Sequence, residues 1–138
     1  MRIARSEVSG RRNGLPDSRF VIFAHGSPDS RWRLPFEELT ASLTERHGAD
    51  KVRLAYMEFV RPSLADVVRE AAQDGKLHLR VLPLFLAAGA HVAEDIPQQI
   101  ADALGSFPQV KIELLQPIGE HPRVKELFRE IACDYARD

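Results

Sequence analysis

Cysteine is almost absent from this chain, and its scarcity removes several classes of protein at once. The single Cys133 allows neither an internal disulfide framework nor a zinc site built from several thiolates, and it fits a reducing compartment such as the cytoplasm. No apolar run approaches the roughly 18 residues that span a bilayer, and we find no signal-peptide pattern. The net charge of -1 argues against nucleic acid as a partner. We therefore expect a cytoplasmic protein that binds neither nucleic acid nor membrane.

The rest of the composition is typical of a globular domain, and it is preceded by an N-terminal segment of different composition. With 138 residues, 44% hydrophobic and 28% charged, the chain is long enough for one domain with a core and too short for two. Residues 1–18 are polar and basic and show neither a helical nor a strand period. We expect them to form a disordered extension, although an arginine-rich tail can also bind an acidic partner or act as an address. The single domain then occupies residues 19–138.

Apolar periodicity predicts four β-α units in this domain. Strands are expected at residues 20–24, 51–56, 77–86 and 110–116, and helices at 30–47, from Pro62 to the stop at 74–75, at 93–104 and at 122–136. Ser30 is the expected N-cap of the first helix, and Pro83 is expected to end the third strand or mark a bulge. The last helix is expected to turn four apolar side chains inward: Val124, Leu127, Phe128 and Ile131. The predicted fold is α/β, a three-layer sandwich with a four-stranded parallel sheet built from flavodoxin-like βα repeats.

The stretch FVIFAHGSPDS, residues 20–30, places polar residues directly after a buried strand. Its five apolar residues are typical of a central parallel strand covered on both faces. His25 then lies where the strand leaves the sheet, and Gly26 allows a sharp turn or a close approach of the backbone. Ligands of open α/β sheets bind outside the carboxyl ends of the strands. His25 is therefore placed for a role in binding.

Three polar residues follow three successive strands at equal intervals. His25, Glu58 and His91 are 33 residues apart in each case, which is one β-α unit. Because parallel strands present their carboxyl ends to one crevice, these side chains can converge there. Two imidazoles and a carboxylate can hold a borderline divalent metal such as Fe, Co, Ni or Zn, and imidazole exchanges protons near neutral pH. The structural alternative stays open, because a histidine at a strand end often only satisfies hydrogen bonds and regular units give regular spacing.

The other histidines are weaker candidates. His47 ends a predicted helix, where the dipole favours a partly positive imidazole, and His78 opens the third strand at the opposite edge of the sheet. His121 follows the fourth strand at the correct edge, but the proline after it suggests that it caps the last helix.

Four segments resemble one known family in order and spacing: HGSPDSRW, YMEFVRPSL, VLPLFLAAGAHVAEDIP and GEHPRV. The resemblance is to the short CbiX/SirB family of sirohydrochlorin chelatases and spans roughly residues 19 to 136. It implies a chelatase-like fold and a class II chelatase, a lyase that inserts a divalent metal into a sirohydrochlorin-type tetrapyrrole without ATP. Co²⁺ is the first expectation, with Fe²⁺ or Ni²⁺ as alternatives, in cobalamin or sirohaem biosynthesis. The metal is a substrate, and no tightly bound cofactor is expected.

The resemblance also implies roles for the three spaced residues. His25 and His91 match the metal-binding histidines of the family, and Glu58 matches an assisting glutamate. Relatives usually carry two glycines before the second histidine, whereas this chain has Gly89 and then Ala90. A methyl group at Ala90 narrows the approach of a macrocycle, so this departure bears on the substrate more than on the metal.

The chemistry of a polycarboxylate macrocycle suggests further substrate contacts. Arg31, Arg33 and Arg61 follow the strand ends, where guanidinium groups and helix N-termini suit carboxylates. Ser27 can donate to a substrate carboxylate or satisfy the loop backbone, and Gly89 is expected to contact the substrate. Each arginine taken singly also fits a solvated surface. A broad tetrapyrrole and relatives with two such domains further predict a homodimer.

Two other functions remain compatible with the residues. One is a non-catalytic metal carrier or sensor with the same ligands, which tetrapyrrole metallation would distinguish. The other is a flavodoxin-like module whose loop at residues 26–30 holds a phosphate at a helix N-terminus, a function that requires neither His91 nor Glu58.

Overall fold

The computed structural model describes residues 18–87 and 89–137, except for the side chains of Ala90 and His91. The expected disordered extension therefore lies outside the described residues, apart from Ser18, which already belongs to the first strand. The elements follow the predicted β-α order: β1 (Ser18–Ala24), α1 (Ser30–His47), β2 (Val52–Tyr56), α2 (Leu64–Gln73), β3 (His78–Pro83), α3 (Ala90–Gly105), β4 (Lys111–Leu114), the 3₁₀ turn η1 (Ile118–Glu120) and α4 (Pro122–Ala136).

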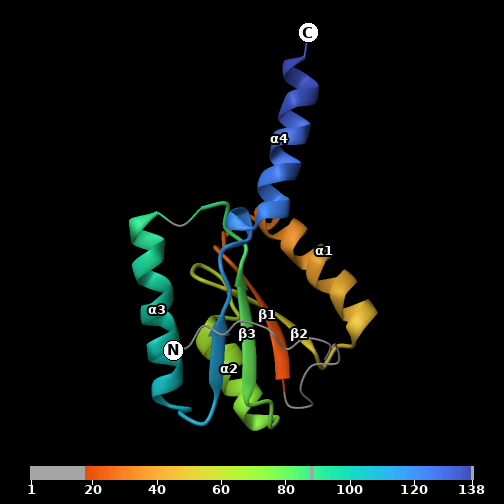
Figure 1. Cartoon of the computed structure of the whole chain (residues 1–138). Coiled ribbons are helices and arrows are strands. Elements are labelled where there is room, and N and C mark those ends of the chain that lie inside the picture. The colour runs from red at the N-terminus through yellow and green to blue at the C-terminus, as the bar shows by residue number, and fades with distance from the viewer. Residues whose placement is uncertain (1–17, 88, 138) are drawn as a thin grey trace.

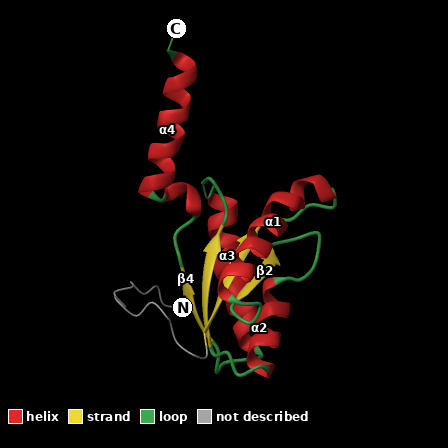
Figure 2. Cartoon of the chain, turned by 90° about the vertical axis from the view of Figure 1, so that its right-hand side faces the viewer, coloured by secondary structure: helices red, strands yellow, loops and turns green. Residues whose placement is uncertain are grey.

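The four strands form one parallel sheet in the order β2-β1-β3-β4 (Figures 1 and 2). This arrangement confirms the predicted α/β class and the four-stranded parallel sheet. The apolar run of residues 20–24 lies in β1, between two neighbouring strands, as its unbroken apolarity predicted. The carboxyl ends of all four strands meet at one edge of the sheet.

The residues that cap the first two helices differ slightly from the predicted ones. Asp29, rather than Ser30, caps α1, because its carboxylate accepts a hydrogen bond from the backbone N–H of Arg31. The second helix begins at Leu64, after Pro62, because Ser63 and Asp66 cap each other's backbone N–H groups in a reciprocal capping box.

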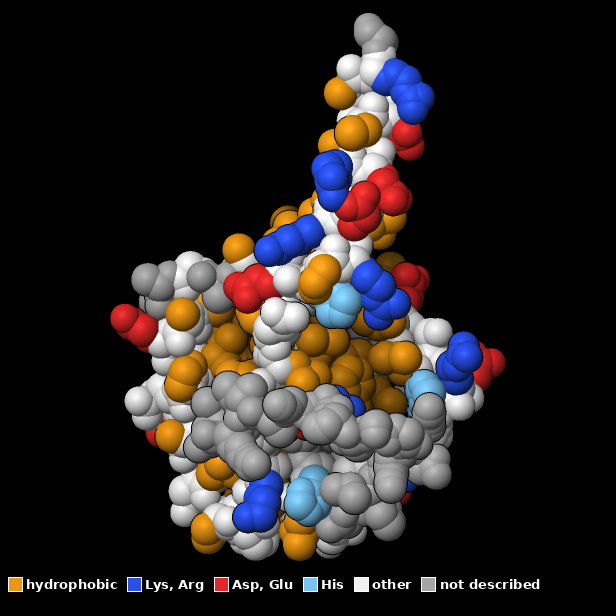
Figure 3. Space-filling model, viewed as in Figure 1, with side chains coloured by type: hydrophobic (Ala, Val, Ile, Leu, Met, Phe, Trp, Pro, Cys, Tyr) orange, Lys and Arg blue, Asp and Glu red, His pale blue; other side chains and the backbone are white. Residues whose placement is uncertain are grey.

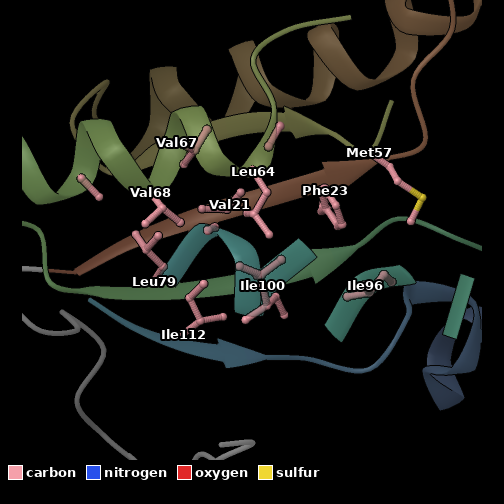
Figure 4. Close-up of a cluster of buried hydrophobic side chains, with 14 of the residues drawn as sticks. Val21, Phe23, Met57, Leu64, Val67, Val68, Leu79, Ile96, Ile100 and Ile112 are labelled. Carbon is pink, nitrogen blue, oxygen red and sulfur yellow. The ribbon is translucent and has the colours of Figure 1, made fainter. Parts of the chain in front are cut away.

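Most of the core lies between the sheet and the pair α2 and α3. Alternate residues of the strands point to this side, where the helices bury their own apolar faces against them (Figure 4). The cluster includes Val21, Phe23, Leu64, Val67, Val68, Leu79, Val81, Ile96, Ile100 and Ile112. Pro83 ends β3, as one of its two predicted roles required.

The opposite face of the sheet carries α1, which contacts β2 and β1. Crossovers explain this division: β2 lies on one side of β1 whereas β3 and β4 lie on the other, so right-handed connections place α1 on one face and α2 and α3 on the opposite one. None of the helices in residues 18–137 is long and apolar enough to cross a membrane.

The last helix departs from the prediction. The bounds 122–136 are correct, but the expected inward side chains are not buried: Leu127, Phe128 and Ile131 are each about half exposed, and Val124 is half-buried. The reason is the direction of α4, which projects from the body of the domain and carries the C-terminus away from it (Figures 1 and 2).

Candidate metal and substrate site

His25 and Glu58 meet because the backbone brings their loops into contact. Gly26 has φ +97°, and a Cβ at this position would lie 2.0 Å from the carbonyl oxygen of Glu58. The backbone N–H of Glu58 donates to the carbonyl oxygen of His25 at 3.1 Å, and that of Met57 donates to Ala24 at 2.8 Å. The glycine therefore permits the close approach that joins the loop after β1 to the loop after β2.

The two side chains lie next to each other at the carboxyl edge. His25 Nε2 is 3.5 Å from Glu58 Oε2, and the side chains are 53% and 48% exposed. The ring of Phe85 meets the His25 imidazole edge to face, with centroids 6.1 Å apart, and so supports its orientation. An imidazole and a carboxylate at this separation, open to solvent, can share a proton or contribute ligands to one cation.

The loops after β3 and β4 are fixed to the same edge. The backbone N–H of Leu84 donates to Phe23 at 2.9 Å, and the N–H of Gly119 donates to Phe85 at 3.0 Å. A Cβ on Gly119 would lie 1.9 Å from the carbonyl oxygen of Leu86, so only glycine permits this contact. Sequence reasoning missed Gly119, although the glycine of GEHPRV was the available signal.

His91 lies in the first turn of α3, directly after the loop that leaves β3. Its side chain is outside the described residues, so its part in the site stays a prediction. Among the side chains that are described, no group of three His, Cys, Asp or Glu residues is placed to hold a metal ion. The described side chains therefore supply two candidate metal ligands, His25 and Glu58.

The remaining histidines occupy the positions predicted for them. His47 is the last residue of α1, and His78 is the first residue of β3, at the amino edge of the sheet. His121 caps α4, because its Nδ1 accepts a hydrogen bond from the backbone N–H of Arg123 at 3.0 Å. The capping role favoured by its following proline is confirmed.

Two of the predicted substrate residues, Ser27 and Arg31, have partners within the loop after β1. Ser27 Oγ accepts from the backbone N–H of Asp29 at 3.0 Å, and the Arg31 guanidinium lies 2.7 Å from the Asp29 carboxylate. That guanidinium lowers the pKa of Asp29. Arg33 Nη1 donates to the carbonyl oxygens of Ser27 and Pro28, and these two hydrogen bonds stabilise the conformation of the loop. Arg31 remains 87% exposed at its side chain and can still reach a ligand.

Arg61 is likewise paired at the loop after β2. Its guanidinium lies 2.5 Å from the carboxylate of Asp66, a residue that also belongs to the capping box of α2. This hydrogen bond, with help from the backbone of Ser63, holds the pKa of Asp66 well below its usual range. Asp66 thus ties the exposed Arg61 to a helix start.

Large apolar side chains are exposed on the segments that follow β1, β2 and β3. Phe59 and Leu86, which directly follow Glu58 and Phe85, are each 67% exposed, and Trp32 in the first turn of α1 is 70% exposed. Phe59 also has φ 73°, an unfavourable conformation for a residue with a side chain. Sequence reasoning did not single out these residues. They add exposed apolar surface to the segments that leave the carboxyl edge of the sheet.

Fold and site together define a class: parallel α/β domains with an imidazole–carboxylate pair at the carboxyl edge of the sheet. Within this class the chain belongs to the CbiX family, whose family model matches residues 19–135. This match confirms the resemblance seen in the four segments.

The relatives include curated enzymes and a solved structure. The chain is 33% identical over 111 residues to the chloroplastic sirohydrochlorin ferrochelatase of Arabidopsis thaliana, covering 80% of this chain and 49% of that protein, so it spans about half of the plant enzyme. It is 32% identical to the sirohydrochlorin cobaltochelatase of Sulfurisphaera tokodaii, covering 80% and 87%. A crystal structure of a protein from Marinobacter aquaeolei VT8, assigned to cobalamin biosynthesis as a CbiX protein, matches with a TM-score of 0.73 and 35% identity, covering 86% of this chain and 94% of that one.

Proposed function

We propose that this chain is a sirohydrochlorin-type class II chelatase, which inserts a divalent metal into a tetrapyrrole without ATP. Membership of the CbiX family supports the assignment, as do relatives named as sirohydrochlorin cobaltochelatase and ferrochelatase. The observation that carries it is the His25–Glu58 pair, 3.5 Å apart on loops joined at the carboxyl edge.

The reaction requires a ligand that releases its metal and a base that accepts protons. Metal insertion forms bonds from the ion to pyrrole nitrogens while two pyrrole N–H protons leave. We assign His25 and His91 to the incoming metal, because neutral imidazole binds borderline divalent ions but holds them less tenaciously than a thiolate. We assign Glu58 to the protons and to the balance of positive charge, since its carboxylate adjoins His25 and is half exposed to solvent.

The residues at the carboxyl edge of the sheet suit a flat macrocycle that carries carboxylates. Arg31 supplies an exposed guanidinium, Ser27 of the same loop supplies a hydroxyl group, and Gly89 at the start of α3 supplies a backbone contact. Phe59 and Trp32 offer exposed aromatic faces that can lie against a tetrapyrrole ring. In this proposal apolar contact places the ring and charged groups orient its edge.

Several finer features belong to the same proposal. Co²⁺ is the first candidate metal, because the Sulfurisphaera relative is named a cobaltochelatase, and Fe²⁺ and Ni²⁺ follow. We further propose a single catalytic domain at residues 19–138, a cytoplasmic location consistent with the one exposed free thiol, and a homodimer in which a second domain completes a site broad enough for the substrate.

The direct test follows the absorbance of sirohydrochlorin with Co²⁺, Fe²⁺ or Ni²⁺, with and without the purified protein. We expect faster metallation than the uncatalysed rate with at least one metal. His25→Ala should weaken metal binding and nearly abolish acceleration, whereas Glu58→Gln should slow turnover more than it weakens binding. His47→Ala, at the far end of α1, is the control and should keep the wild-type rate. Equal rates for wild type and His25→Ala would overturn the assignment.

A non-catalytic metal carrier is the second candidate, because half-exposed His25 and Glu58 also suit a protein that binds and passes on an ion. Metal binding without acceleration for any of the three metals would favour it. The phosphate-binding module has less support, because the Asp29 carboxylate already occupies the N-terminus of α1.

A further inference from the structure

Phe59, in the loop after β2, is held in an unfavourable backbone conformation. Among residues 18–87 and 89–137 it is the only non-glycine residue with a positive φ, which is 73°. The backbone N–H of Val60 donates to the carbonyl oxygen of Glu58 at 2.9 Å and closes a γ-turn around Phe59. A γ-turn whose central residue has a positive φ is the rarer and more strained form of this turn. A phenylalanine therefore stands where glycine or asparagine would fit with less strain.

Hydrogen bonds at both ends of the loop maintain this turn. At its start, the carbonyl oxygen of Met57 accepts a hydrogen bond from Gln99 Nε2 of α3 at 3.1 Å. At its end, the carbonyl oxygen of Pro62 accepts one from the backbone N–H of Tyr56 at 2.8 Å. These contacts flank both Phe59 and the glutamate that precedes it. The strain is thus part of the same loop structure that holds the carboxylate of the metal pair.

The strained turn also leaves an aromatic ring in solvent. Phe59 is 67% exposed, so its ring gains little stability from packing within the domain. A smaller residue that accepts a positive φ would remove both the backbone strain and the exposed apolar surface. Glu58, the preceding residue, lies 3.5 Å from His25. A side chain that lowers stability in two ways, one residue from the candidate metal ligands, indicates a role in binding.

Another apolar surface of the domain is less suitable for the macrocycle. Figure 3 shows hydrophobic side chains gathered in a hollow over the sheet at the foot of α4. That hollow lies over a face of the sheet, whereas His25 and Glu58 lie in the loops beyond the carboxyl ends of β1 and β2. A ring bound in the hollow would not bring its central nitrogens to the metal pair.

We propose that Phe59 is a specificity-determining residue, whose ring lies against the face of the tetrapyrrole and holds its central nitrogens beside Glu58 and His25. The inference rests on the chelatase function proposed above. It names the substrate class as a flat, conjugated macrocycle, because offset stacking requires two planar faces. A reduced tetrapyrrole with tetrahedral bridge carbons is not planar and would lose this contact.

The first experiment compares stability, metal binding and kinetics in Phe59→Gly and Phe59→Asn, which accept a positive φ and lack the ring. We expect melting temperatures from the wild-type value to about 4 °C above it. The affinity for Co²⁺ in calorimetry should be unchanged, whereas KM for sirohydrochlorin should rise about tenfold and kcat should change far less. Phe59→Tyr keeps a flat ring and should keep the wild-type KM.

Three results of this experiment would overturn the proposal. The first is a wild-type KM in Phe59→Gly. The second is a lower melting temperature together with weaker Co²⁺ binding, because Phe59 would then only shape the loop. The third is the loss of a wild-type dimer in light scattering, which would assign the ring to an interface between two copies.

Leu86→Ala is the matched control for apolar area. Leu86 follows β3 and is 67% exposed, the same fraction as Phe59, but its side chain is not flat. Its removal should raise KM much less than the removal of the Phe59 ring. An equal rise in the two variants would show that apolar area rather than a flat ring binds the macrocycle, and would contradict the proposed specificity.

The second experiment tests the substrate class without any metal. Uroporphyrin and uroporphyrinogen carry the same carboxylates, but only the first is flat and conjugated. Their binding is measured anaerobically, by the fluorescence of uroporphyrin and by competition with uroporphyrinogen. The wild type should prefer uroporphyrin about tenfold, and Phe59→Gly should bind both equally. A wild type without preference, or a preference that survives in Phe59→Gly, would refute the role of Phe59.

The two experiments also separate this inference from the chelatase assignment. Accelerated metallation by a wild type that shows no preference for the flat ring would leave the chelatase assignment standing and remove the role of Phe59. A ring-dependent preference in a protein that accelerates no metallation would do the reverse.

Discussion

Gly26→Ala is the substitution that tests most directly how the backbone assembles the site. Gly26 combines φ +97° with a position where a Cβ would lie 2.0 Å from the Glu58 carbonyl oxygen. Gly75, in the turn after α2, provides a matched control, because it has φ +76° but no atom within 4 Å of its Cβ position. The same change therefore adds backbone strain at both positions and a collision at only one.

The two costs can be worked out separately. A left-handed conformation costs an alanine about 1–2 kcal/mol, which is the whole effect expected for Gly75→Ala. At Gly26 the backbone of Glu58 must also move aside by about 1 Å or more, and displacing a packed backbone adds roughly 1–3 kcal/mol. With roughly 4 °C per kcal/mol for a domain of this size, Gly75→Ala should lower the melting temperature by about 4–8 °C and Gly26→Ala by about 8–20 °C.

Measuring metallation separates the effect of backbone strain from the effect of moving Glu58 away from His25. The movement forced by the added methyl group carries Glu58 away from His25, so metallation per folded molecule should fall strongly in Gly26→Ala. Gly75→Ala should metallate at the wild-type rate below its melting temperature. If both variants melt within about 2 °C of each other and both keep full activity, the close approach of the two loops does not build the site.

Three further results are expected. Asp66→Asn should flatten the pH dependence of stability. The pKa of Asp66 is lowered in the folded protein, so its charged carboxylate contributes stability that is complete above the ordinary pKa of 3.8 and is lost as the pH falls below that value. Between about pH 6 and 2, the melting temperature of the wild type should therefore decline more steeply than that of the variant. Removing residues 1–17 should leave folding and metallation intact, because no periodic apolar face ties them to the core; a truncated protein that fails to fold would contradict this. Glu58→Gln should reduce turnover without matching the loss of metal affinity in His25→Ala, as calorimetry with Co²⁺ can measure.

Local patterns in the sequence predict this fold well because its elements carry strong local signals. The unbroken apolar run of β1 identifies a central strand, and the spacing of apolar residues identifies all four α-helices of the described chain. Helix starts and caps were less accurate: α3 begins at Ala90 instead of residue 93, α2 begins after Pro62, and Ser30 is the first residue of α1 but not its cap. The choice of Asp29 and Ser63 depends on which side chain reaches the free N–H groups.

The site was predictable to the extent that it follows from topology. Residues that follow neighbouring parallel strands must meet at one edge of the sheet, and this rule correctly predicts that His25 and Glu58 lie close together. The rule does not show which polar residues are already engaged. Arg33 bonds to carbonyl oxygens of its own loop and Arg61 to Asp66, and these contacts depend on loop conformations that residue types alone do not specify.

The fourth helix shows where local pattern stops being informative. Its stripe from Val124 to Tyr135 correctly predicts that the helix needs an apolar partner surface, because amphipathic spacing expresses a requirement for burial. The pattern does not state which surface meets that requirement, since a sheet face in the same chain and one in a second copy have the same chemistry. The direction of the connection decides whether its own sheet lies within reach, and here Gly119 and His121 direct α4 outward. A helix predicted to face inward can thus be correct in its bounds and its apolar face, while its burial depends on the direction of a connection that local pattern does not encode.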